Sequence, residues 1–470
     1  MRIRPRDVLA LALCLASAGC FPQPKFEAEA ARLPKSTLPA SPLEVTRVPP
    51  PAGLTPPPPG MELGWPPPYT YGNATPPPTA IPPPTSPFRF DPEVVNILLL
   101  GSDQRSAEGG FRTDVLILLS VHPGQRAAAM ISIPRDLYVY LPGYSMQRIN
   151  TAFQLGESLN YPGGGPGMLA DTVRYNLGLT VHHFVRVEMD GFRRIIDTLG
   201  GVDVNVACSY RDWRLKDPAM NPNVVANWQL YTVPRGVVHM EGDYALWYAR
   251  SRQRSSDFDR SRRQHEVLRA AYRQSLQLNL LPNLPDLYDE LRSSFTTDFA
   301  LPDLLELAPL AARIDLSKVQ SRFIGRDQVI SWRVPTTGAQ VLIPRPDAIQ
   351  ALLQSALEGE APDPLVPDQA PTVEVVNASG QDGWPSLAAE RLNYAGYAAY
   401  LGGSSEQAGS NTLLVDYGLA PPGEAERLLQ ALGLGLPRLV SLPDPSSPFS
   451  FRLVLGADYN PCFDPTRNQS

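Results

Sequence analysis

The sequence VVNILLLG at residues 94–101 is a short, continuous apolar run that ends in glycine. Runs of this kind are typical of strands that are buried within a sheet. Two later runs, Val115–Val121 and Ala128–Ile133, repeat the pattern. We therefore expect ordered structure to begin at Val94 and these three runs to form strands.

Helical segments alternate with further strands downstream of these runs. Phe192–Leu199 is expected to be a helix, because Gly200 and Gly201 follow it and glycine commonly ends a helix. The alternation of strands and helices predicts an α/β sandwich. The other helices are expected at Pro166–Leu177 and Asp259–Leu278, and the other strands at Phe184–Met189, at Val202–Val206 and within Gln320–Val334.

A second, smaller α/β domain of roughly 90 residues is expected at residues 372–461, near the lower end of domain size. It contains no cluster of acids, bases or nucleophiles. A proline-rich linker at 358–371 separates it from the first domain at 91–357. Its strands are expected at Val373–Val376, Asn411–Asp416 and Phe451–Leu455, and its helices at Trp384–Ala395 and Gly423–Leu432.

The first 20 residues have the pattern of an export signal. Three arginines precede the apolar stretch Val8–Ala18, which is too short to span a bilayer as a stable helix. Small residues then lead to Cys20 and resemble the lipobox of bacterial lipoproteins, although Ser17 stands where leucine is usual. We expect a lipoprotein-type signal peptide at 1–20 with a lipid on Cys20. An ordinary signal peptide and an anchor helix remain alternatives, and each exports the protein.

Residues 21–90 contain many of the 52 prolines of the chain. Proline has no amide donor and cannot join ordinary ladders or helices, so we expect an extended, semi-rigid segment. Such a segment would serve as a stalk that holds the first domain off a membrane, or as a disordered spacer with no length requirement.

The net charge and the cysteines narrow the range of functions. The chain carries a net charge of −6 and no stripe of mixed aromatic and basic residues, which argues against nucleic acid as a partner. No cysteine or histidine spacing is typical of a zinc site. Cys208 and Cys462 remain beyond the signal region, and a disulfide between them is permitted in an oxidising compartment but not established by the sequence.

Charged residues that suit a phosphate ester lie beside the predicted strands and at the start of the long helix. Asp103 and Asp114 could hold a Mg²⁺ ion, which prefers oxygen ligands. Arginine matches phosphate oxygens with a planar fork of donors. Any one Asp–Arg pair could equally be a structural ion pair, so the hypothesis rests on their occurrence together. The arginines concerned are Arg105, Arg112, Arg135, Arg250, Arg252 and Arg260, with Arg254, Arg262 and Arg263 close by.

At these residues the chain resembles the LytR-CpsA-Psr (LCP) family of bacterial cell-wall glycopolymer transferases, from about Val94 to Leu278. The C-terminal unit resembles the LytR C-terminal domain, though its motifs VEVVNASG (373–380) and VLGADY (454–459) are short. The family motifs found in order are NILLLGSDQR (96–105), RTD (112–114), SIPRD (132–136), RINTAF (148–153), LGGVDV (199–204), GDYALWYARSR (242–252) and DFDRSRRQ (257–264).

The resemblance implies an LCP-type α/β/α sandwich that transfers a glycopolymer from an undecaprenyl-pyrophosphate carrier to a peptidoglycan or other wall acceptor, leaving a phosphodiester. Asp103 and Asp114 would bind Mg²⁺, or Mn²⁺ in its place. The polyprenyl tail would lie in an apolar tunnel formed by the strands and by Phe192–Leu199. The implied catalytic arginines are Arg135, Arg250, Arg252 and Arg260, and the implied pyrophosphate-binding set adds Arg105, Arg112 and Arg263.

The sequence allows alternatives for the roles of Arg263 and Asp259 and for the activity. Arg263 could support the helix as well as bind a ligand, whereas Arg254 and Arg262 are expected to be solvated. Asp259 stands where the family commonly has glycine, and its carboxylate could perturb an arginine. The same residues would also suit a lipid-pyrophosphate hydrolase. A third alternative is a non-enzymatic envelope protein that binds anionic glycan, for which Asp103 and Asp114 would be dispensable while the arginines would be needed for binding.

Overall fold

The computed structural model describes residues 80–90, 93–102, 112–278, 284–314, 319–335, 337–357, 371–405 and 409–462. The predicted signal peptide with Cys20, most of the first proline-rich linker and the second linker up to residue 370 lie outside these ranges. Asp103 and Arg105 also lie outside them. Among the described residues, no helix combines the length and the hydropathy that a membrane span requires.

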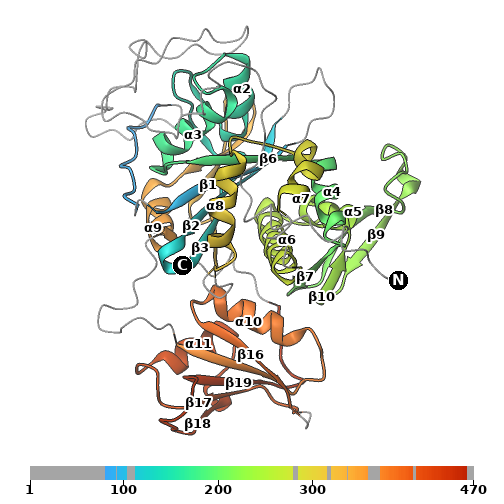
Figure 1. Ribbon diagram of the computed structural model, residues 1–470, viewed down its shortest axis with the longest axis vertical. Coiled ribbons are helices and arrows are strands. Elements are labelled where there is room, and N and C mark those ends of the chain that lie inside the picture. The colour runs from blue at the N-terminus through green and yellow to red at the C-terminus, as the bar shows by residue number, and fades with distance from the viewer. Residues whose placement is uncertain are drawn as a thin grey trace.

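A six-stranded mixed sheet forms the centre of the first domain, in the order β11-β6-β1-β2-β3-β12. The strand β2 is antiparallel to both β1 and β3, whereas β6 is parallel to β1 and β12 is parallel to β3. The strands predicted from the apolar runs are therefore confirmed, and they are direct neighbours (Figure 1). Their bounds are β1 Val95–Ser102, β2 Thr113–His122, β3 Ala127–Ser132, β6 His183–Glu188, β11 Phe295–Thr297 and β12 Val319–Phe323.

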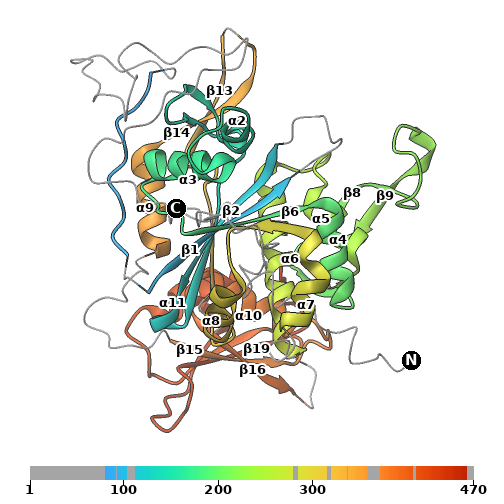
Figure 2. The same ribbon diagram turned by 45° about the horizontal axis from the view of Figure 1, so that its top comes forward.

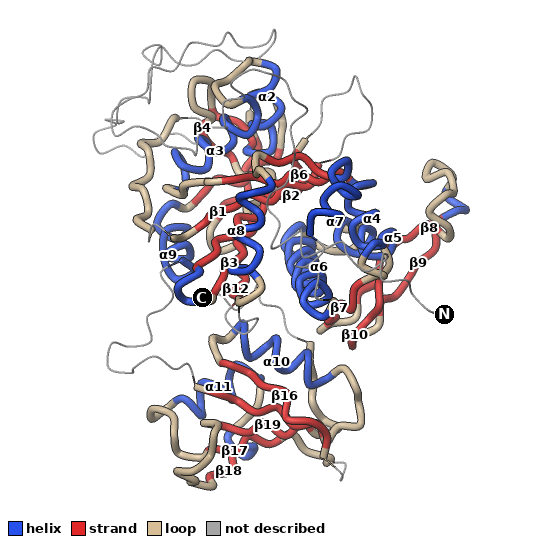
Figure 3. Tube along the Cα trace, viewed as in Figure 1, coloured by secondary structure: helices blue, strands red, loops and turns tan. Residues whose placement is uncertain are grey.

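Both faces of this sheet are covered by helices, as Figures 2 and 3 show from two directions. In β1, Ile97 packs into the core on one face and Leu98 into the core on the other, so both faces of the strand are apolar. This arrangement confirms the α/β/α sandwich. One face carries α2 Ala152–Ser158, α3 Gly164–Leu177 and α9 Pro346–Leu357; the other carries α4 Met189–Thr198, α5 Gly242–Arg250, α6 Asp257–Gln277, α7 Leu284–Leu291 and α8 Leu301–Ala311.

The strand directions bring several loop ends to one edge of the sheet. Asp114 was expected just before the strand Val115–Val121, and it is the second residue of β2. It still lies at the shared edge, because β2 is antiparallel to its neighbours and starts where β1 and β3 end. Glu188, at the end of β6, pairs with Ser102 at the end of β1. This edge is where ligands gather in α/β folds.

Four two-stranded antiparallel sheets extend the first domain. Two of their strands were predicted: β7 has the expected bounds Val202–Val206, and β13 lies within Gln320–Val334. The other six strands are short and carry mixed polar and apolar residues, so the apolar-run criterion does not detect them. The β8–β9 hairpin projects beside α5, whereas the β7–β10 pair lies beside α6 (Figure 1). The paired strands are β7 Val202–Val206 with β10 Gly236–Met240, β8 Tyr210–Leu215 with β9 Trp228–Val233, β4 Tyr138–Tyr140 with β5 Met146–Arg148, and β13 Val329–Arg333 with β14 Gln340–Pro344.

The last part of the predicted stalk packs on the first domain. The side chain of Ile81 is 2% exposed and contacts Tyr175 of α3. The Tyr175 hydroxyl donates a hydrogen bond to the carbonyl of Pro82 at 2.7 Å, and the amide of Thr85 donates to the Tyr175 carbonyl at 2.8 Å. The packed structure therefore begins before residue 90, where the sequence alone placed the end of the linker.

The C-terminal domain contains a five-stranded sheet in the order β16-β15-β19-β17-β18, seen below the first domain in Figure 1. The predicted strands and helices of this domain are present within one or two residues, whereas β16 and β18 were not foreseen. The elements are β15 Thr372–Asn377, α10 Trp384–Tyr394, β16 Ala398–Ser404, β17 Leu413–Asp416, α11 Glu424–Leu432, β18 Leu439–Ser441 and β19 Phe451–Leu455.

A disulfide and a buried polar contact join the two domains. Cys208, just after β7, is bonded to Cys462 at the end of the C-terminal domain. On α10, Glu390 is 8% exposed, accepts a hydrogen bond from Asn205 at 2.8 Å and pairs with Arg269 of α6 at 3.5 Å. Because a buried carboxylate is costly without partners, this contact fixes the position of α10 on the first domain.

We expect Cys208→Ser to destabilise the protein by about 2–4 kcal/mol, because the disulfide closes a long chain segment and restricts the unfolded state. Calorimetric unfolding with and without a reducing agent measures this loss. The reducing agent should lower the melting temperature of the wild type and leave that of Cys208→Ser unchanged. An equal shift in both proteins would contradict the prediction.

Candidate functional site

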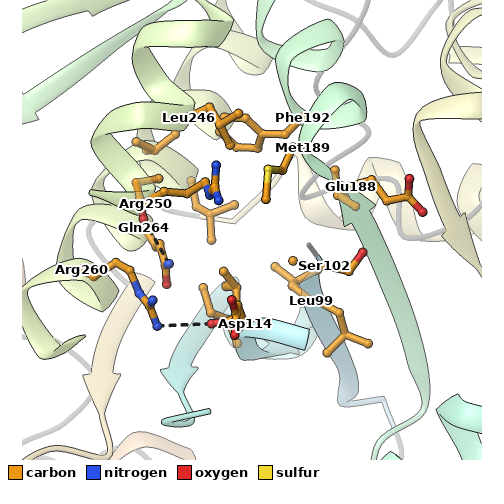
Figure 4. Close-up of a pocket in the computed structure, with 18 of the residues that line it drawn as sticks. Leu99, Ser102, Asp114, Glu188, Met189, Phe192, Leu246, Arg250, Arg260 and Gln264 are labelled. Atoms are coloured by element: carbon orange, nitrogen blue, oxygen red, sulfur yellow. Dashed lines mark hydrogen bonds between the residues drawn. The ribbon is translucent and has the colours of Figure 1, made fainter. Parts of the chain in front are cut away.

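A cavity of about 320 Å³ opens between the central sheet and the helices α4, α5 and α6. Most of its lining is apolar, and its residues come from strands and helices that are far apart in the sequence (Figure 4). A largely apolar surface of this kind suits a hydrocarbon ligand. The apolar lining consists of Leu99, Leu100, Val115, Ile117, Val185, Val187, Met189, Phe192, Ile195, Ile196, Leu246, Ala249, Val267, Leu268 and Ala271.

Four arginines line this apolar cavity at one end, and together they are called the arginine rim: Arg135, Arg250, Arg252 and Arg260. Arg135 follows β3, Arg250 ends α5, and Arg260 lies in the first turn of α6. Figure 4 shows Arg250 and Arg260 beside the cavity, with Asp114 of β2 below them. The structure thus brings together the four arginines that the resemblance singled out, and it places them against an apolar interior.

Asp257 holds three of these four arginines in place. Its carboxylate accepts a hydrogen bond from Arg252 at 2.8 Å and pairs with Arg135 and Arg260, each at 3.3 Å. Asp257 lies in the family motif DFDRSRRQ, but the sequence analysis predicted no role for it. Its position three residues before Arg260 could have predicted the ion pair, because side chains three apart share a helix face.

The charges around Asp257 determine its protonation. Burial by itself raises the pKa of this carboxyl, but the charge of Arg260 and the hydrogen bond from Arg252 outweigh burial. The pKa of Asp257 is therefore below its ordinary value of 3.8. The carboxylate stays ionised at neutral pH and offsets the mutual repulsion of the three guanidinium groups that it contacts.

We expect Asp257→Asn to lower the free energy of unfolding by about 1–2 kcal/mol at neutral pH. Because the folded-state pKa is depressed, this contribution is fully present above the unfolded-state pKa. It is lost as the pH falls through the folded-state pKa, below 3.8. Denaturant unfolding of the wild type and of Asp257→Asn, from about pH 8 to pH 3, measures the difference in their free energies of unfolding and tests this expectation. A difference that already shrinks between about pH 7 and pH 5 would contradict it.

The start of α6 explains the unusual Asp259. Ser256 caps the helix by accepting a hydrogen bond from the Asp259 amide at 3.1 Å, and the Asp259 carboxylate accepts from the Ser256 amide at 3.0 Å and from its hydroxyl at 2.8 Å. This is a capping box, which satisfies amide donors at the helix start. Asp259 therefore stabilises the start of α6, and among the described residues its carboxylate makes no hydrogen bond or ion pair with Arg260.

Two other arginines of the cluster are structural in this fold. Arg263 is 0% exposed and is not among the cavity residues. It donates hydrogen bonds to the carbonyls of Tyr248 and Ser251 and stacks 4.0 Å from the ring of Tyr210. Arg262, which was expected to be solvated, is instead buried and paired with Glu266 on the next turn of α6. The expectation for Arg262 was wrong because the helix turns this face toward the core.

Of the remaining predicted residues, the structure describes Asp114, Arg112 and Arg254. Arg112 is exposed just before β2 and is not among the residues that line the apolar cavity. Arg254 is exposed, as expected. Asp114 lines the cavity and accepts a hydrogen bond from Arg135 at 2.8 Å. Within the described ranges, no group of three or more histidine, cysteine, aspartate or glutamate side chains could hold a metal ion.

Three polar atoms at the site have no hydrogen-bond partner among the described residues. They are Nε of Arg135, Nε of Arg260, whose residue is 7% exposed, and Oγ of Ser102 at the end of β1. Buried donors normally have partners, so these atoms are available to a ligand with oxygen acceptors. Ser102, Glu188 and Gln264 line the cavity and were not singled out from the sequence, because single polar residues carry no pattern.

Two curated relatives are similar to part of the chain. This chain is 34% identical over 217 residues to the polyisoprenyl-teichoic acid–peptidoglycan teichoic acid transferase TagU of Oceanobacillus iheyensis. The match covers 46% of this chain and 62% of that protein. It is 32% identical over 216 residues to the protein of the same name from Halalkalibacterium halodurans, covering 45% and 63%. The chain therefore spans less than two thirds of the length of either relative.

Two solved structures are also similar. The crystal structure of B. subtilis TagV has a TM-score of 0.45 at 23% identity and covers 57% of this chain and 99% of that chain. The crystal structure of B. subtilis TagT has a TM-score of 0.42 at 25% identity and covers 58% and 94%.

Family matches cover both domains. Residues 370–459 match the family described as LytR cell envelope-related transcriptional attenuator, and these residues form the C-terminal domain. Residues 85–352 match the LytR_cpsA_psr family. The second match spans more than half of the chain and contains the apolar cavity and the whole arginine rim. The chain belongs to the LytR_cpsA_psr family.

Proposed function

We propose that this protein transfers a glycopolymer from a polyprenyl-pyrophosphate carrier to a hydroxyl of a cell-wall acceptor, peptidoglycan, and leaves a phosphodiester. One observation carries this proposal: the arginine rim lies directly at the end of an apolar cavity. A polyprenyl pyrophosphate has the same order of parts, with a hydrocarbon chain joined to a compact double anion. The activity in the names of the two TagU relatives supports the same reaction.

The arginine rim provides what a phosphoryl transfer needs most, which is positioning and charge stabilisation. In the proposed reaction, an acceptor hydroxyl oxygen forms a bond to the phosphorus that carries the glycan. The bond from that phosphorus to the bridging oxygen breaks, polyprenyl phosphate leaves with the electron pair, and the hydroxyl proton is released. Guanidinium groups at Arg135 and Arg260 are buried enough for their charge to act at low local dielectric.

We further propose that Mg²⁺, or Mn²⁺ in its place, binds with the pyrophosphate through Asp114 and Asp103. Asp114 fits this role, because it lies beside the arginine rim and its side chain is 33% exposed. Mg²⁺ often uses one or two carboxylates and completes its coordination with phosphate oxygens and water. When bound, the ion would neutralise charge on the pyrophosphate.

The sequence pattern around Cys20 supports a lipid anchor on the outer face of the cell membrane. An anchored stalk would hold the first domain beside its membrane-bound substrate. Labelling cells with a fatty-acid probe tests this proposal, since Cys20→Ala should abolish the label on this protein. A label that persists in Cys20→Ala would place the lipid elsewhere.

A reconstituted transfer assay tests the proposed function. The full chain is incubated in lipid vesicles with a polyprenyl-pyrophosphate-linked glycan, peptidoglycan and Mg²⁺. Glycan attached to the peptidoglycan through a phosphodiester is the expected product. Release of free phosphorylated glycan would instead indicate a hydrolase, and binding without either product would indicate a glycan-binding protein.

Two measurements test the metal assignment: the transfer rate and the binding of Mn²⁺. We expect Asp114→Ala to lower the rate by at least about 100-fold, because it removes a metal ligand and a partner of Arg135. Titration calorimetry with Mn²⁺ in the presence of farnesyl pyrophosphate should show metal binding in the wild type and none in the variant. The matched control is Asp217→Ala, an exposed aspartate in the β8–β9 loop. Equal Mn²⁺ binding by Asp114→Ala would contradict the assignment.

A further inference from the structure

A second cavity, of about 480 Å³, adjoins the arginine rim. Leu246, Arg250 and Arg252 line both this cavity and the apolar cavity. Helix α5 separates the two, because Ala249 lines only the apolar cavity whereas Trp247 lines only the second one. The two cavities therefore meet at the arginines.

The lining of the second cavity differs in chemistry from that of the first. Three indole rings line it: Trp213 of β8, Trp228 of β9 and Trp247 of α5. Trp213 is 41% exposed, which is unusual for so large an apolar side chain. Charged groups also line the cavity, including the ion pair of Arg193 and Asp243 at 2.6 Å, and both members are partly exposed. The cavity thus combines flat apolar faces with accessible donors and acceptors.

Hydrogen bonds fix the β8–β9 hairpin beside the arginine rim. The indole nitrogen of Trp247 donates to the carbonyl of Trp213 at 2.8 Å. The buried carboxylate of Asp212 accepts from the amide of Gln253, at 3.1 Å, in the loop that carries Arg252. The hairpin and the arginine loop therefore form one connected unit, and the second cavity is shaped before any ligand arrives.

Arg214 strengthens this unit from within. Its guanidinium group lies 4.3 Å from the ring of Tyr244, 5.0 Å from that of Tyr231 and 5.5 Å from that of Trp247. Cation–π contacts of this kind satisfy the charge with aromatic faces. The positive charge of Arg214 is therefore held against aromatic rings in the wall of the second cavity.

We propose that the second cavity binds a saccharide. A sugar ring has an apolar face of C–H groups and an edge of hydroxyls, which match indole faces and the charged donors and acceptors beside them. The inference rests on the proposed function, because a carrier whose tail lies in the apolar cavity and whose pyrophosphate contacts the arginine rim continues beyond the rim as sugar. The second cavity is the space that adjoins this point.

Two saccharides could occupy the cavity, and both would lie within reach of the arginine rim. One is the first sugars of the carrier-linked glycan. The other is the sugar of the wall acceptor, whose hydroxyl must approach the same phosphorus. Their shared chemistry is a neutral or weakly charged sugar ring, and separate probes distinguish the two sources.

The test measures binding of three probes to the full chain by titration calorimetry: farnesyl pyrophosphate, a farnesyl-pyrophosphate-linked disaccharide and a soluble peptidoglycan glycan strand. We expect Trp213→Ala to weaken binding of at least one saccharide probe about tenfold, the size of a lost stacking contact. Farnesyl pyrophosphate should bind the variant as it binds the wild type. Loss confined to the linked disaccharide identifies the donor, and loss confined to the strand identifies the acceptor.

Trp228→Ala is the second variant, and Tyr400→Ala is the matched control, since Tyr400 is a similarly exposed aromatic residue of the C-terminal domain at 46%. If the wild type binds farnesyl pyrophosphate but neither tryptophan variant weakens any saccharide probe, the saccharide proposal is overturned. An equal loss for all three probes also overturns it. If the wild type does not bind farnesyl pyrophosphate, the proposed function fails instead, and the glycan-strand measurements still decide the saccharide proposal.

Discussion

Arg260→Ala should lower the transfer rate on the order of 10³-fold, the largest loss expected among the arginine-rim variants. Arg260 is 7% exposed, its Nε lacks a partner among the described residues, and it contacts both Asp257 and the carbonyl of Asp114. Burial lowers the pKa of its guanidinium group more than the nearby Asp257 raises it, but arginine remains charged at physiological pH. The fixed positive charge of Arg260 is therefore available to stabilise the negative charge that develops on the leaving phosphate.

Arg254→Ala is the control for this prediction, because Arg254 lies six residues away, is exposed and does not line the apolar cavity. It should transfer glycan at the wild-type rate. Arg260→Lys should recover only a small part of the loss, since an ammonium group cannot reproduce a planar fork of donors. A rate for Arg260→Ala within tenfold of the wild type, with an unchanged melting temperature, would remove Arg260 from the catalytic site.

Arg263→Ala should destabilise the first domain by about 3–5 kcal/mol and lower its melting temperature by roughly 10 °C. Arg263 is 0% exposed, and its guanidinium group donates to the carbonyls of Tyr248 and Ser251 and to the hydroxyl of Ser255 at 3.0 Å. Truncation leaves these buried acceptors unpaired and opens a cavity beside the Tyr210 ring.

Differential scanning calorimetry of Arg263→Ala, with Arg254→Ala as the control, measures this effect. The control should melt within about 1 °C of the wild type, because exposed surface substitutions rarely change stability. The alternative role for Arg263, a direct contact with pyrophosphate, predicts the reverse pattern. In that case the melting temperature would be unchanged, and farnesyl pyrophosphate would bind the variant more weakly.

The local sequence was sufficient to predict the sandwich and much of the arginine rim. Continuous apolar runs such as Val115–Val121 are typical of buried central strands, and the glycines after Phe192–Leu199 are typical of a helix end. Short hairpins such as β8–β9 could not be predicted in this way. Their strands are half exposed and irregular in pattern, and they are held by Asp212 and by aromatic contacts from α5.

The sequence by itself determined which residues carry charge suited to a pyrophosphate and which segments are apolar enough to form a core. Only the tertiary structure decided which of the clustered arginines faces the cavity. Arg260 and Arg263 are three residues apart, yet Arg260 lines the cavity and Arg263 is enclosed by backbone carbonyls. The reason is physical: the role of a charged side chain depends on the acceptors and solvent around it, and segments distant in sequence supply both.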